Sequence, residues 1–188
     1  MTENTNSKFP SEADVVIVGV GGIVGSMIAY WLSELGQKNI IGLEKSSVIP
    51  SDIASTAHAS DFVYNTTHDK LGCWTTAYSR KFYEDNGFFL KKGGLEICRK
   101  GDDARWEELK RKVGSGKAFG TNVRLISASE AKEKFPLLDE ESLMGAMWDP
   151  DAGLVIPRSQ DVVSFAVESA KDKGALKTFT DTPAIDFE

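Results

Sequence analysis

The chain reads DVVIVGVGGIVGSMIAYWLSELGQKNIIGLE over residues 14–44, and this stretch has the pattern of a strand, a glycine-rich turn, a helix and a second strand. Residues 15–18 are β-branched and end at a glycine, which is typical of a strand buried on both faces in a parallel sheet. Apolar residues at helical spacing predict a helix over 22–35, closed by Gly36 where a helix end favours positive φ. Residues 39–44 predict the second strand, which a right-handed crossover makes parallel to the first.

The turn contains four glycines, and the strand that follows the helix ends in an acidic residue at the sequence separation typical of dinucleotide-binding units. In a dinucleotide-binding unit, such glycines allow a tight bend, let the backbone approach a pyrophosphate and pack the helix closely on the strand. Glu44 ends the second strand 19 residues after Gly25, close to the ~20 expected for a carboxylate that holds ribose hydroxyls. The candidate cofactor-binding residues of this unit are Gly19, Gly21, Gly22, Ile23, Val24, Gly25, Glu44 and Lys45.

The glycine spacing departs from the usual GxGxxG pattern. If Gly25 is its third glycine, the first position falls on Val20, whereas a motif that starts at Gly19 has Val24 in third place. A one-residue insertion in the turn accounts for both alignments. We therefore expect an α/β protein with a Rossmann-like FAD- or NAD(P)-binding domain and a parallel sheet, and the acid favours FAD or NAD over NADP.

The rest of the chain predicts further elements around a long polar loop. Residues 46–65 are rich in Ser, Thr, Ala and Asp without a sustained period, and ordered loops of this length usually carry function. Residues 1–12 are polar and predict a flexible leader before a domain that spans 13–188. The other predicted elements are helices over 68–84, 102–119 and 159–173, a short helix from a Ser127–Glu130 capping box to Pro136, a strand pair within 88–99, a hairpin within 145–156 and a strand over 176–179.

Composition excludes several classes of function. The 28 acidic and 22 basic residues are scattered along the chain, so no basic face for nucleic acid is expected. No apolar stretch reaches the roughly 20 residues of a membrane span, and the first ten residues lack a signal-peptide core, which predicts a cytoplasmic protein. Cys73 and Cys98 are not in a CxxC spacing and only two histidines are present, so no metal site is expected and an organic cofactor is favoured.

Six stretches of the chain form a recognisable set, and these are residues 14–25, Leu43-Glu44-Lys45, Ser55-Thr56-Ala57-His58-Ala59, 93–96, 135–139 and 148–153. Together they resemble D-amino-acid-oxidase-type flavoproteins, most closely the branch of dimethylglycine oxidase, dimethylglycine dehydrogenase and sarcosine dehydrogenase. The resemblance implies an FAD enzyme that takes a hydride from a secondary or tertiary amine such as dimethylglycine or sarcosine. It also implies that the chain is the N-terminal, incomplete part of that fold, with the start of an antiparallel-sheet substrate domain.

The same resemblance implies a role for the loop around His58. In that branch the histidine of the Ser-Thr-x-His-Ala run carries a covalent bond to the flavin 8α-methyl group, and His58 stands in that position. The alternative is a loop histidine that bonds to the backbone, and Ser60-Asp61 departs from the branch pattern just after it. Ser55 and Thr56 would meet the pyrophosphate or the ribityl chain, or else contribute only loop polarity.

Two other functions remain open at this point. An NAD-linked dehydrogenase shares the glycine turn and Glu44, but gives no reason for the long Ser/Thr/His loop. An inactive or regulatory remnant of a flavoprotein is compatible with the irregular turn. A strand expected at Phe187 and Glu188 would present an exposed edge that favours self-association, and the sequence names no catalytic residue.

Overall fold

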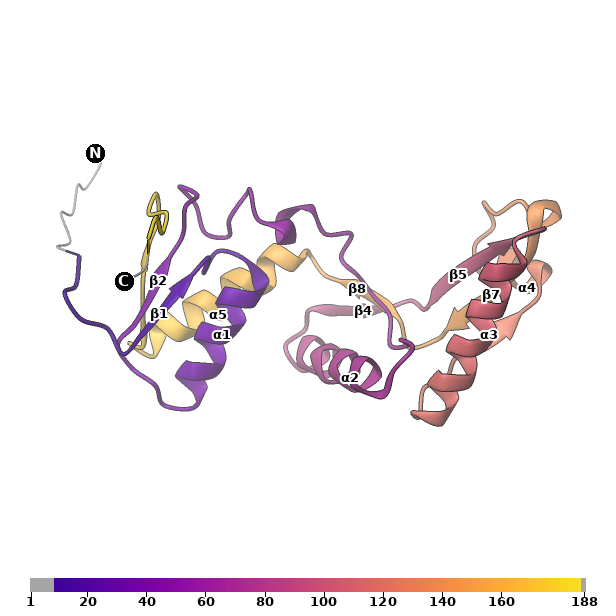
Figure 1. Ribbon diagram of the computed structural model, residues 1–188, viewed down its shortest axis with the longest axis horizontal. Helices are drawn as coiled ribbons and strands as arrows, with labels where there is room; N and C mark the ends of the chain where they lie inside the picture. The colour runs from indigo at the N-terminus through magenta and orange to yellow at the C-terminus, as the bar shows by residue number, and fades with distance from the viewer. Residues whose placement is uncertain (1–8, 187–188) are drawn as a thin grey trace. The chain divides into compact units, whose positions relative to one another are not determined.

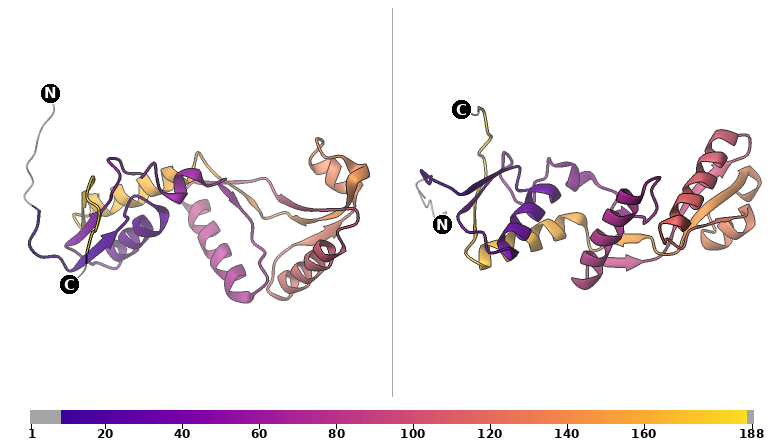
Figure 2. Two further views of the ribbon diagram at one scale, coloured as in Figure 1. Left: turned by 45° about the horizontal axis from the view of Figure 1, so that its top comes forward. Right: turned by 60° about the horizontal axis from the view of Figure 1, so that its bottom comes forward.

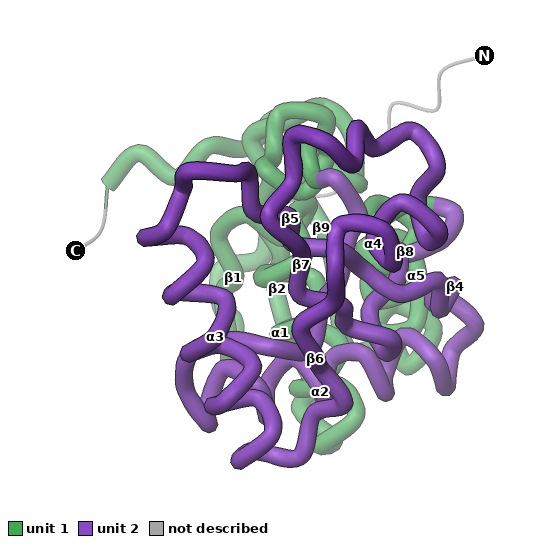
Figure 3. The backbone as a smooth tube through the Cα atoms, turned by 90° about the vertical axis from the view of Figure 1, so that its right-hand side faces the viewer, with its two compact units in different colours: residues 1–59, 158–188 green, residues 60–157 purple. Residues whose placement is uncertain are grey.

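A computed structural model describes residues 9–186 and divides into two compact units (Figure 3). Unit 1 comprises residues 1–59 and 158–188, and unit 2 comprises residues 60–157. Unit 1 is therefore discontinuous in sequence, and unit 2 begins within the long polar loop 46–65. Most of the predicted leader and the strand expected at Phe187 and Glu188 lie outside the described residues.

Unit 1 contains the parallel sheet that the sequence predicts (Figure 1). Strands β1 (Val15–Val18), β2 (Ile40–Leu43) and β9 (Leu176–Phe179) lie in the order β1-β2-β9, and both pairings are parallel. Helix α1 (Ile23–Glu34) connects β1 to β2, and α5 (Ser159–Asp172) leads into β9. The predicted strand, glycine turn, helix and strand are confirmed, with α1 one residue shorter at each end than expected.

The two helices of unit 1 cover one face of this sheet. Ile17 and Ile40 point into a core that is completed by side chains of α1 and α5, among them Ala29 and Val167. Because successive side chains of a strand point to opposite faces, Val16 and Val18 lie on the other face, where they are 54% and 52% exposed. The sequence pattern predicted burial of β1 on both faces, and this is wrong for the described part of the chain.

Unit 2 contains two three-stranded antiparallel sheets. The first has the order β3-β8-β4, and the second has the order β5-β7-β6. The helices of the unit are α2 (Lys70–Asp85), α3 (Asp103–Ala118) and α4 (Ala128–Lys134). The strands are β3 (Phe62–Val63), β4 (Phe89–Lys91), β5 (Gly94–Arg99), β6 (Arg124–Ile126), β7 (Leu143–Asp149) and β8 (Gly153–Val155), with a 3₁₀ turn η2 (Glu140–Ser142) before β7.

The predicted hairpin within residues 145–156 is wrong in its pairing. β7 pairs with β5, and β8 pairs with β4, so neither sheet contains a β7–β8 pair or a β4–β5 pair. Two bent extended segments, 89–99 and 143–155, run antiparallel to each other. The bend in the first lies at Gly93, which has a φ of +77° and donates its N–H to the Ala152 carbonyl at 2.8 Å. Glycine in a strand pattern marks such bends as readily as hairpin turns.

Helices α3 and α4 pack against opposite faces of the β5-β7-β6 sheet (Figure 2). Met147 lies in a cluster with Leu109 of α3, whereas Ala146 lies in a cluster with Ala131 of α4. This alternation along β7 shows that both faces of the strand are used. The predicted capping box is confirmed at the start of α4, where Ser127 accepts the Glu130 N–H and the Glu130 side chain accepts the Ser127 N–H.

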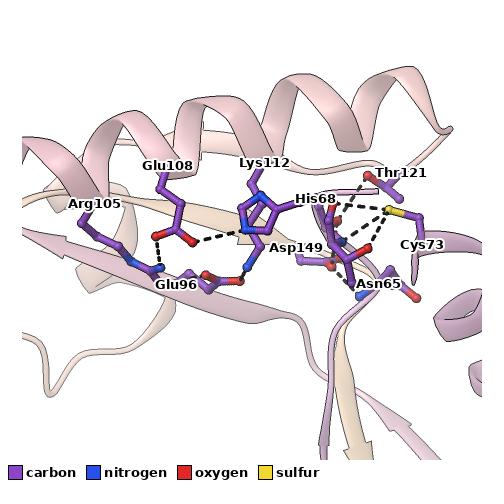
Figure 4. Close-up of polar contacts among 11 residues, drawn as sticks. Asn65, His68, Cys73, Glu96, Arg105, Glu108, Lys112, Thr121 and Asp149 are labelled. Atoms are coloured by element: carbon purple, nitrogen blue, oxygen red, sulfur yellow. Dashed lines mark hydrogen bonds and ion pairs between the residues drawn. The ribbon is translucent and has the colours of Figure 1, made fainter. Parts of the chain in front are cut away.

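Asp149, in the stretch Trp148-Asp149-Pro150-Asp151, ties strand β7 to the loop before α2 (Figure 4). Its buried carboxylate accepts the N–H of Asn65 at 2.9 Å and the N–H of Asp151 at 3.0 Å. Bonds from backbone N–H groups to a buried carboxylate compensate for its desolvation. Asp149 therefore has a structural role here.

An ion-pair network joins α3 to strand β5 in the same unit (Figure 4). The Glu96 carboxylate accepts hydrogen bonds from Arg105 at 2.8 Å and from Lys112 at 2.5 Å. Arg105 also binds Glu108, and Glu108 Oε1 lies 3.3 Å from His68 Nε2. Because a partly buried pair is less screened than one at the surface, this network helps to fix α3 against the sheet.

Asp151, in the turn that follows β7, makes the stability of that turn depend on pH. The Lys91 ammonium, through its hydrogen bond, is the main cause that lowers the pKa of the Asp151 carboxyl, and the Asn122 amide adds to it. A carboxyl with a lowered folded-state pKa contributes stability above its unfolded pKa of ~3.9, and this contribution is lost as the pH falls through the folded value. The turn is therefore expected to loosen only in acid.

Within residues 9–186, no helix is both long and apolar enough to cross a membrane. The same residues contain no group of three or more His, Cys, Asp or Glu side chains arranged to hold a metal ion.

Candidate functional site

The turn between β1 and α1 is one residue longer than the turn of a GxGxxG motif, and its glycines have separate roles. Gly19 has a φ of +85°, which glycine adopts without strain, so it makes the tight bend. A Cβ on Gly25 would lie 2.3 Å from the Gly19 carbonyl oxygen, so Gly25 is the residue that packs the helix on the strand. Gly19 and Gly25 therefore take the first and third positions of the motif. This geometry agrees with the expected one-residue insertion.

Glu44, at the end of β2, closes this turn from the other side. Its carboxylate is 4% exposed and accepts the Gly21 N–H at 2.9 Å and the Ser46 N–H at 3.0 Å. A Cβ on Gly21 would lie 2.7 Å from Glu44 Oε2, so this approach requires a glycine. A carboxylate bound by two backbone N–H groups is held in one position, and Glu44 thereby fixes the turn.

A cavity of about 420 Å³ opens beside the turn in unit 1. Five of the predicted cofactor residues line it, and these are Gly19, Gly22, Glu44, Lys45 and Ser55. Gly22 is the N-cap of α1, so the positive end of the helix dipole lies at the cavity wall. The sequence-predicted turn and its acid are thus brought together around one cavity.

Thr56 supports the turn instead of lining the cavity. It lies in the 3₁₀ turn η1 (Ser55–His58), and its buried hydroxyl accepts the Ile23 N–H at 3.0 Å. Ile23 is the first residue of α1, so this bond caps the helix from a distant loop. A helix N-terminus has unpaired N–H groups that such side chains stabilise.

The Thr56→Val variant is expected to lower the free energy of unfolding by about 1–2 kcal/mol, because the partly buried Ile23 N–H loses its acceptor. Urea denaturation followed by circular dichroism measures the change. The Ser55→Ala variant, which removes an exposed hydroxyl from the same turn, is the matched control and should change stability by less than about 0.5 kcal/mol. Equal effects of the two substitutions would contradict the capping role.

The remaining predicted site residues lie around the cavity without lining it. Gly21, Ile23 and Gly25 form the turn and its contacts with Glu44, Thr56 and Gly19. Val24 faces solvent and is 72% exposed. His58 is exposed at the end of η1.

Two parts of the site were missed by sequence reasoning. Ser51 lines the cavity and is 1% exposed, and its hydroxyl has no hydrogen-bond partner within the described part of the chain. The segment 182–184 also lines the cavity, where the Thr182 N–H bonds to the Glu44 carbonyl at 2.9 Å. Ser51 belongs to the loop 46–65 that was expected to be functional, whereas nothing in the sequence marked the return of 182–184.

These residues fit the adenosine diphosphate part of a dinucleotide. A Cβ on Gly22 would make only ordinary contacts, 3.6 Å from Ala54 Cβ, and a Cβ on Gly19 would meet nothing within 4 Å, so the turn is open on the cavity side. A buried hydroxyl without a partner, a helix N-terminus and the Lys45 cation all suit a phosphate group.

In comparisons with known proteins, a single family model matches residues of both units. The profile described as FAD dependent oxidoreductase (DAO) matches residues 14–188. Human mitochondrial sarcosine dehydrogenase is 27% identical over 165 residues, which is 84% of this chain and 17% of that protein. Mitochondrial pyruvate dehydrogenase phosphatase regulatory subunit from Mus musculus is 28% identical over 184 residues, which is 94% of this chain and 20% of that protein. The chain thus spans a fifth or less of these curated relatives.

Solved structures agree with this result. L-Proline dehydrogenase from P. horikoshii has a TM-score of 0.79 and 28% identity, over 92% of this chain and 45% of that chain. Glycine oxidase from Bacillus cereus has a TM-score of 0.75 at 24% identity, over 94% of this chain and 48% of that chain, and supports the fold. The α/β class with a parallel sheet and antiparallel sheets, predicted from the sequence, is confirmed. With a profile match over nearly all of its length, the chain belongs to the DAO family of FAD-dependent oxidoreductases.

Proposed function

We propose that this chain is the FAD-binding part of an oxidoreductase that oxidises a secondary or tertiary amine such as sarcosine or dimethylglycine. The observation that carries the proposal is the cavity at the β1–α1 turn, with the buried Glu44 carboxylate on one side and the N-terminus of α1 on the other. Glu44 would hold the adenosine ribose hydroxyls. Gly22, Ser51 and Ser55 would face the diphosphate.

FAD, when bound, supplies the acceptor for a hydride from the carbon next to the amine nitrogen. The chain's own residues in unit 1 bind and orient that cofactor. The resulting iminium product hydrolyses in water to an aldehyde and the shortened amine. No described side chain is assigned a catalytic role.

The substrates that appear in the names of the relatives support this substrate class. Besides sarcosine dehydrogenase, human dimethylglycine dehydrogenase is 27% identical over 180 residues, and 4-methylaminobutanoate oxidase from Paenarthrobacter nicotinovorans is 28% identical over 163 residues. Sarcosine, dimethylglycine and 4-methylaminobutanoate are all N-methylated amino acids. The shared chemistry is therefore an N-alkyl amine that carries a carboxylate.

The cofactor part of the proposal is tested by purifying the chain and recording its absorbance with and without added FAD. Flavin absorbance that remains after gel filtration is expected. The proposal that the substrate is an amine is then tested by adding sarcosine or dimethylglycine without oxygen and following the loss of flavin absorbance. A preparation that stays colourless after incubation with FAD would contradict the proposal.

His58 is proposed to carry the flavin covalently. Its imidazole is exposed at the end of η1, and an imidazole nitrogen is a nucleophile. Acid precipitation of the wild-type protein should leave the flavin in the pellet, whereas the His58→Ala variant should release all of it into the supernatant. The His68→Ala variant is the matched control, and release of the flavin from the wild type would contradict the covalent bond.

A regulatory role is the second candidate, and one observation favours it. The pyruvate dehydrogenase phosphatase regulatory subunit matches 94% of this chain. A protein that retains FAD but shows no loss of flavin absorbance with any N-methyl amino acid would favour this candidate.

The NAD-linked alternative is disfavoured by the family, and a titration of NADH fluorescence with no saturable change would exclude it.

The place of the protein in the cell remains a proposal. A cytoplasmic location follows from the sequence expectation alone, and several relatives, sarcosine dehydrogenase among them, are named as mitochondrial. Fractionation of source cells with antibodies against the chain would decide between the two compartments.

Self-association is also proposed, through β1, because the strand expected at Phe187 and Glu188 lies outside the described residues. In the described sheet β1 pairs only with β2, and its Val16 and Val18 side chains are exposed. The Val16→Thr/Val18→Thr double variant is expected to sediment as a smaller species than the wild type at the same concentration. Val48→Thr, on an exposed loop valine, is the control. A wild type that sediments as a monomer at all concentrations would contradict self-association.

A further inference from the structure

A small cavity of unit 2, here called the α2 cavity, lies between helix α2 and the loop that follows α3. Its volume is about 220 Å³, and all of its lining residues belong to unit 2. Trp74, Ala77 and Phe119 form apolar parts of its wall, and Asn65 and Thr121 contribute polar groups. This volume is several times the ~30 Å³ that one water molecule occupies in the liquid. The cavity therefore has room for a ligand with one small ring.

Asn65 brings an unsatisfied amide to this cavity. The residue is 4% exposed, and neither its Oδ1 nor its Nδ2 has a hydrogen-bond partner within residues 9–186. Its backbone, in contrast, is fixed, because the Asn65 N–H donates to Asp149 Oδ2 at 2.9 Å (Figure 4). Burial of a polar group without a partner lowers stability, and nearly all such groups in proteins are paired. A ligand with both a donor and an acceptor would satisfy this amide.

The charged groups that line the α2 cavity do not select a charged ligand. Arg80 donates to the Asp151 carbonyl at 3.2 Å and forms an ion pair with Glu84 at 3.5 Å. The Asp151 carboxylate in turn pairs with Lys91. Lys70 also lines the cavity but is exposed, so an ion pair between it and a bound anion would be weak. The charges thus favour a neutral ligand.

We propose that the α2 cavity binds a small ligand with a primary carboxamide, which forms a pair of hydrogen bonds with Asn65. The ligand carbonyl accepts from Asn65 Nδ2, the ligand N–H donates to Asn65 Oδ1, and the apolar part of the ligand lies against Trp74 and Phe119. A carboxylate would satisfy Nδ2 but would place a second oxygen against Oδ1, and an ammonium group would satisfy Oδ1 alone. Only a neutral group with an adjacent donor and acceptor satisfies both atoms. This site is independent of the cofactor and of the amine chemistry proposed above.

Titrations of the full chain with three probes of nearly equal size test the inference. The probes are benzamide, acetophenone, in which a methyl group replaces the amide nitrogen, and benzoate, in which an oxygen replaces it. Benzamide is expected to bind about tenfold more tightly than acetophenone, because acetophenone leaves Asn65 Oδ1 without a donor. Benzoate should bind no more tightly than acetophenone. The NMR signal of the Trp74 indole N–H in ¹⁵N-labelled protein gives each dissociation constant and reports binding in this cavity.

The Asn65→Leu variant tests which residue provides the selectivity. It should bind benzamide and acetophenone equally, and it should unfold at the same urea concentration as the wild type or at a higher one, because it removes a buried amide without a partner. Asn86→Leu is the matched control, since Asn86 Nδ2 donates to the Phe82 carbonyl at 2.8 Å. This control should unfold at a lower urea concentration and keep the tenfold preference for benzamide.

Four results would overturn the inference. Equal affinities of the wild type for benzamide and acetophenone would do so without any variant, and so would tighter binding of benzoate than of benzamide. A preference for benzamide that persists in Asn65→Leu would show that Asn65 does not hold the carboxamide. An unchanged Trp74 signal with all three probes would leave water as the partner of the Asn65 amide.

Discussion

The Gly25→Ala variant is expected to lose about 2–3 kcal/mol of folding free energy and all measurable FAD binding. The added Cβ would lie 2.3 Å from the Gly19 oxygen and 2.9 Å from both the Gly19 carbonyl carbon and Val20 Cα. These are backbone atoms, which cannot rotate away as a side chain does. Helix α1 must therefore move off β1, and the turn that lines the cavity moves with it.

Urea denaturation and FAD titration of the Gly25→Ala variant measure these two effects. Gly114→Ala is the matched control, since Gly114 lies in α3 and a Cβ there would meet nothing within 4 Å. Because alanine favours the helix over glycine, this control should gain about 0.5–1 kcal/mol and bind FAD as the wild type does. A Gly25→Ala protein with wild-type stability would show that Gly25 does not set the helix-to-strand distance.

The first unit could be predicted from the sequence because its signals are local. The β-branched run at 15–18, the helical spacing up to Gly36 and the strand at 40–43 are each determined within a few residues. Gly36 indeed has a φ of +88°. The same holds for the capping box at Ser127, in which both bonds join residues three apart.

The second unit was harder to predict because its pairings are not local. The bend at Gly93 and the turn before Gly153 looked like hairpins, since short-range signals do not tell a bent strand from a turn. The strand β6 was not predicted at all, because three residues that pair with the centre of β7 have no period of their own. A bent strand differs from a hairpin turn only in its pairing with strands that lie 20 or more residues away in the sequence.

The candidate site was predictable where one residue type serves one purpose. Gly19, Gly22 and Glu44 were identified because backbone conformation and charge restrict those positions. Thr56 was placed in the right region with a different task, since a hydroxyl bonds a phosphate or a helix N–H equally well.

Replacing Glu44 is expected to have the second large effect, and its two roles can be separated. In the Glu44→Ala variant two buried N–H groups, of Gly21 and Ser46, lose their acceptor, which should cost about 3 kcal/mol of stability and weaken FAD binding about 100-fold. Glu44→Gln keeps one acceptor oxygen and should cost less. Glu12→Gln, on an exposed carboxylate before β1, is the matched control for the loss of charge.

A readout beyond stability distinguishes a ribose contact from a purely structural carboxylate. If Glu44 accepts hydrogen bonds from ribose hydroxyls, the wild type should bind ADP about ten- to a hundredfold more tightly than 2′-deoxy-ADP, because a charged acceptor gains about 1.5–3 kcal/mol from such a bond. The Glu44→Gln variant should lose most of this preference while Glu12→Gln retains it, as measured by calorimetry at one salt concentration. Equal affinities of the wild type for both nucleotides would mean that the carboxylate only holds the turn, as its bonds to Gly21 and Ser46 already do.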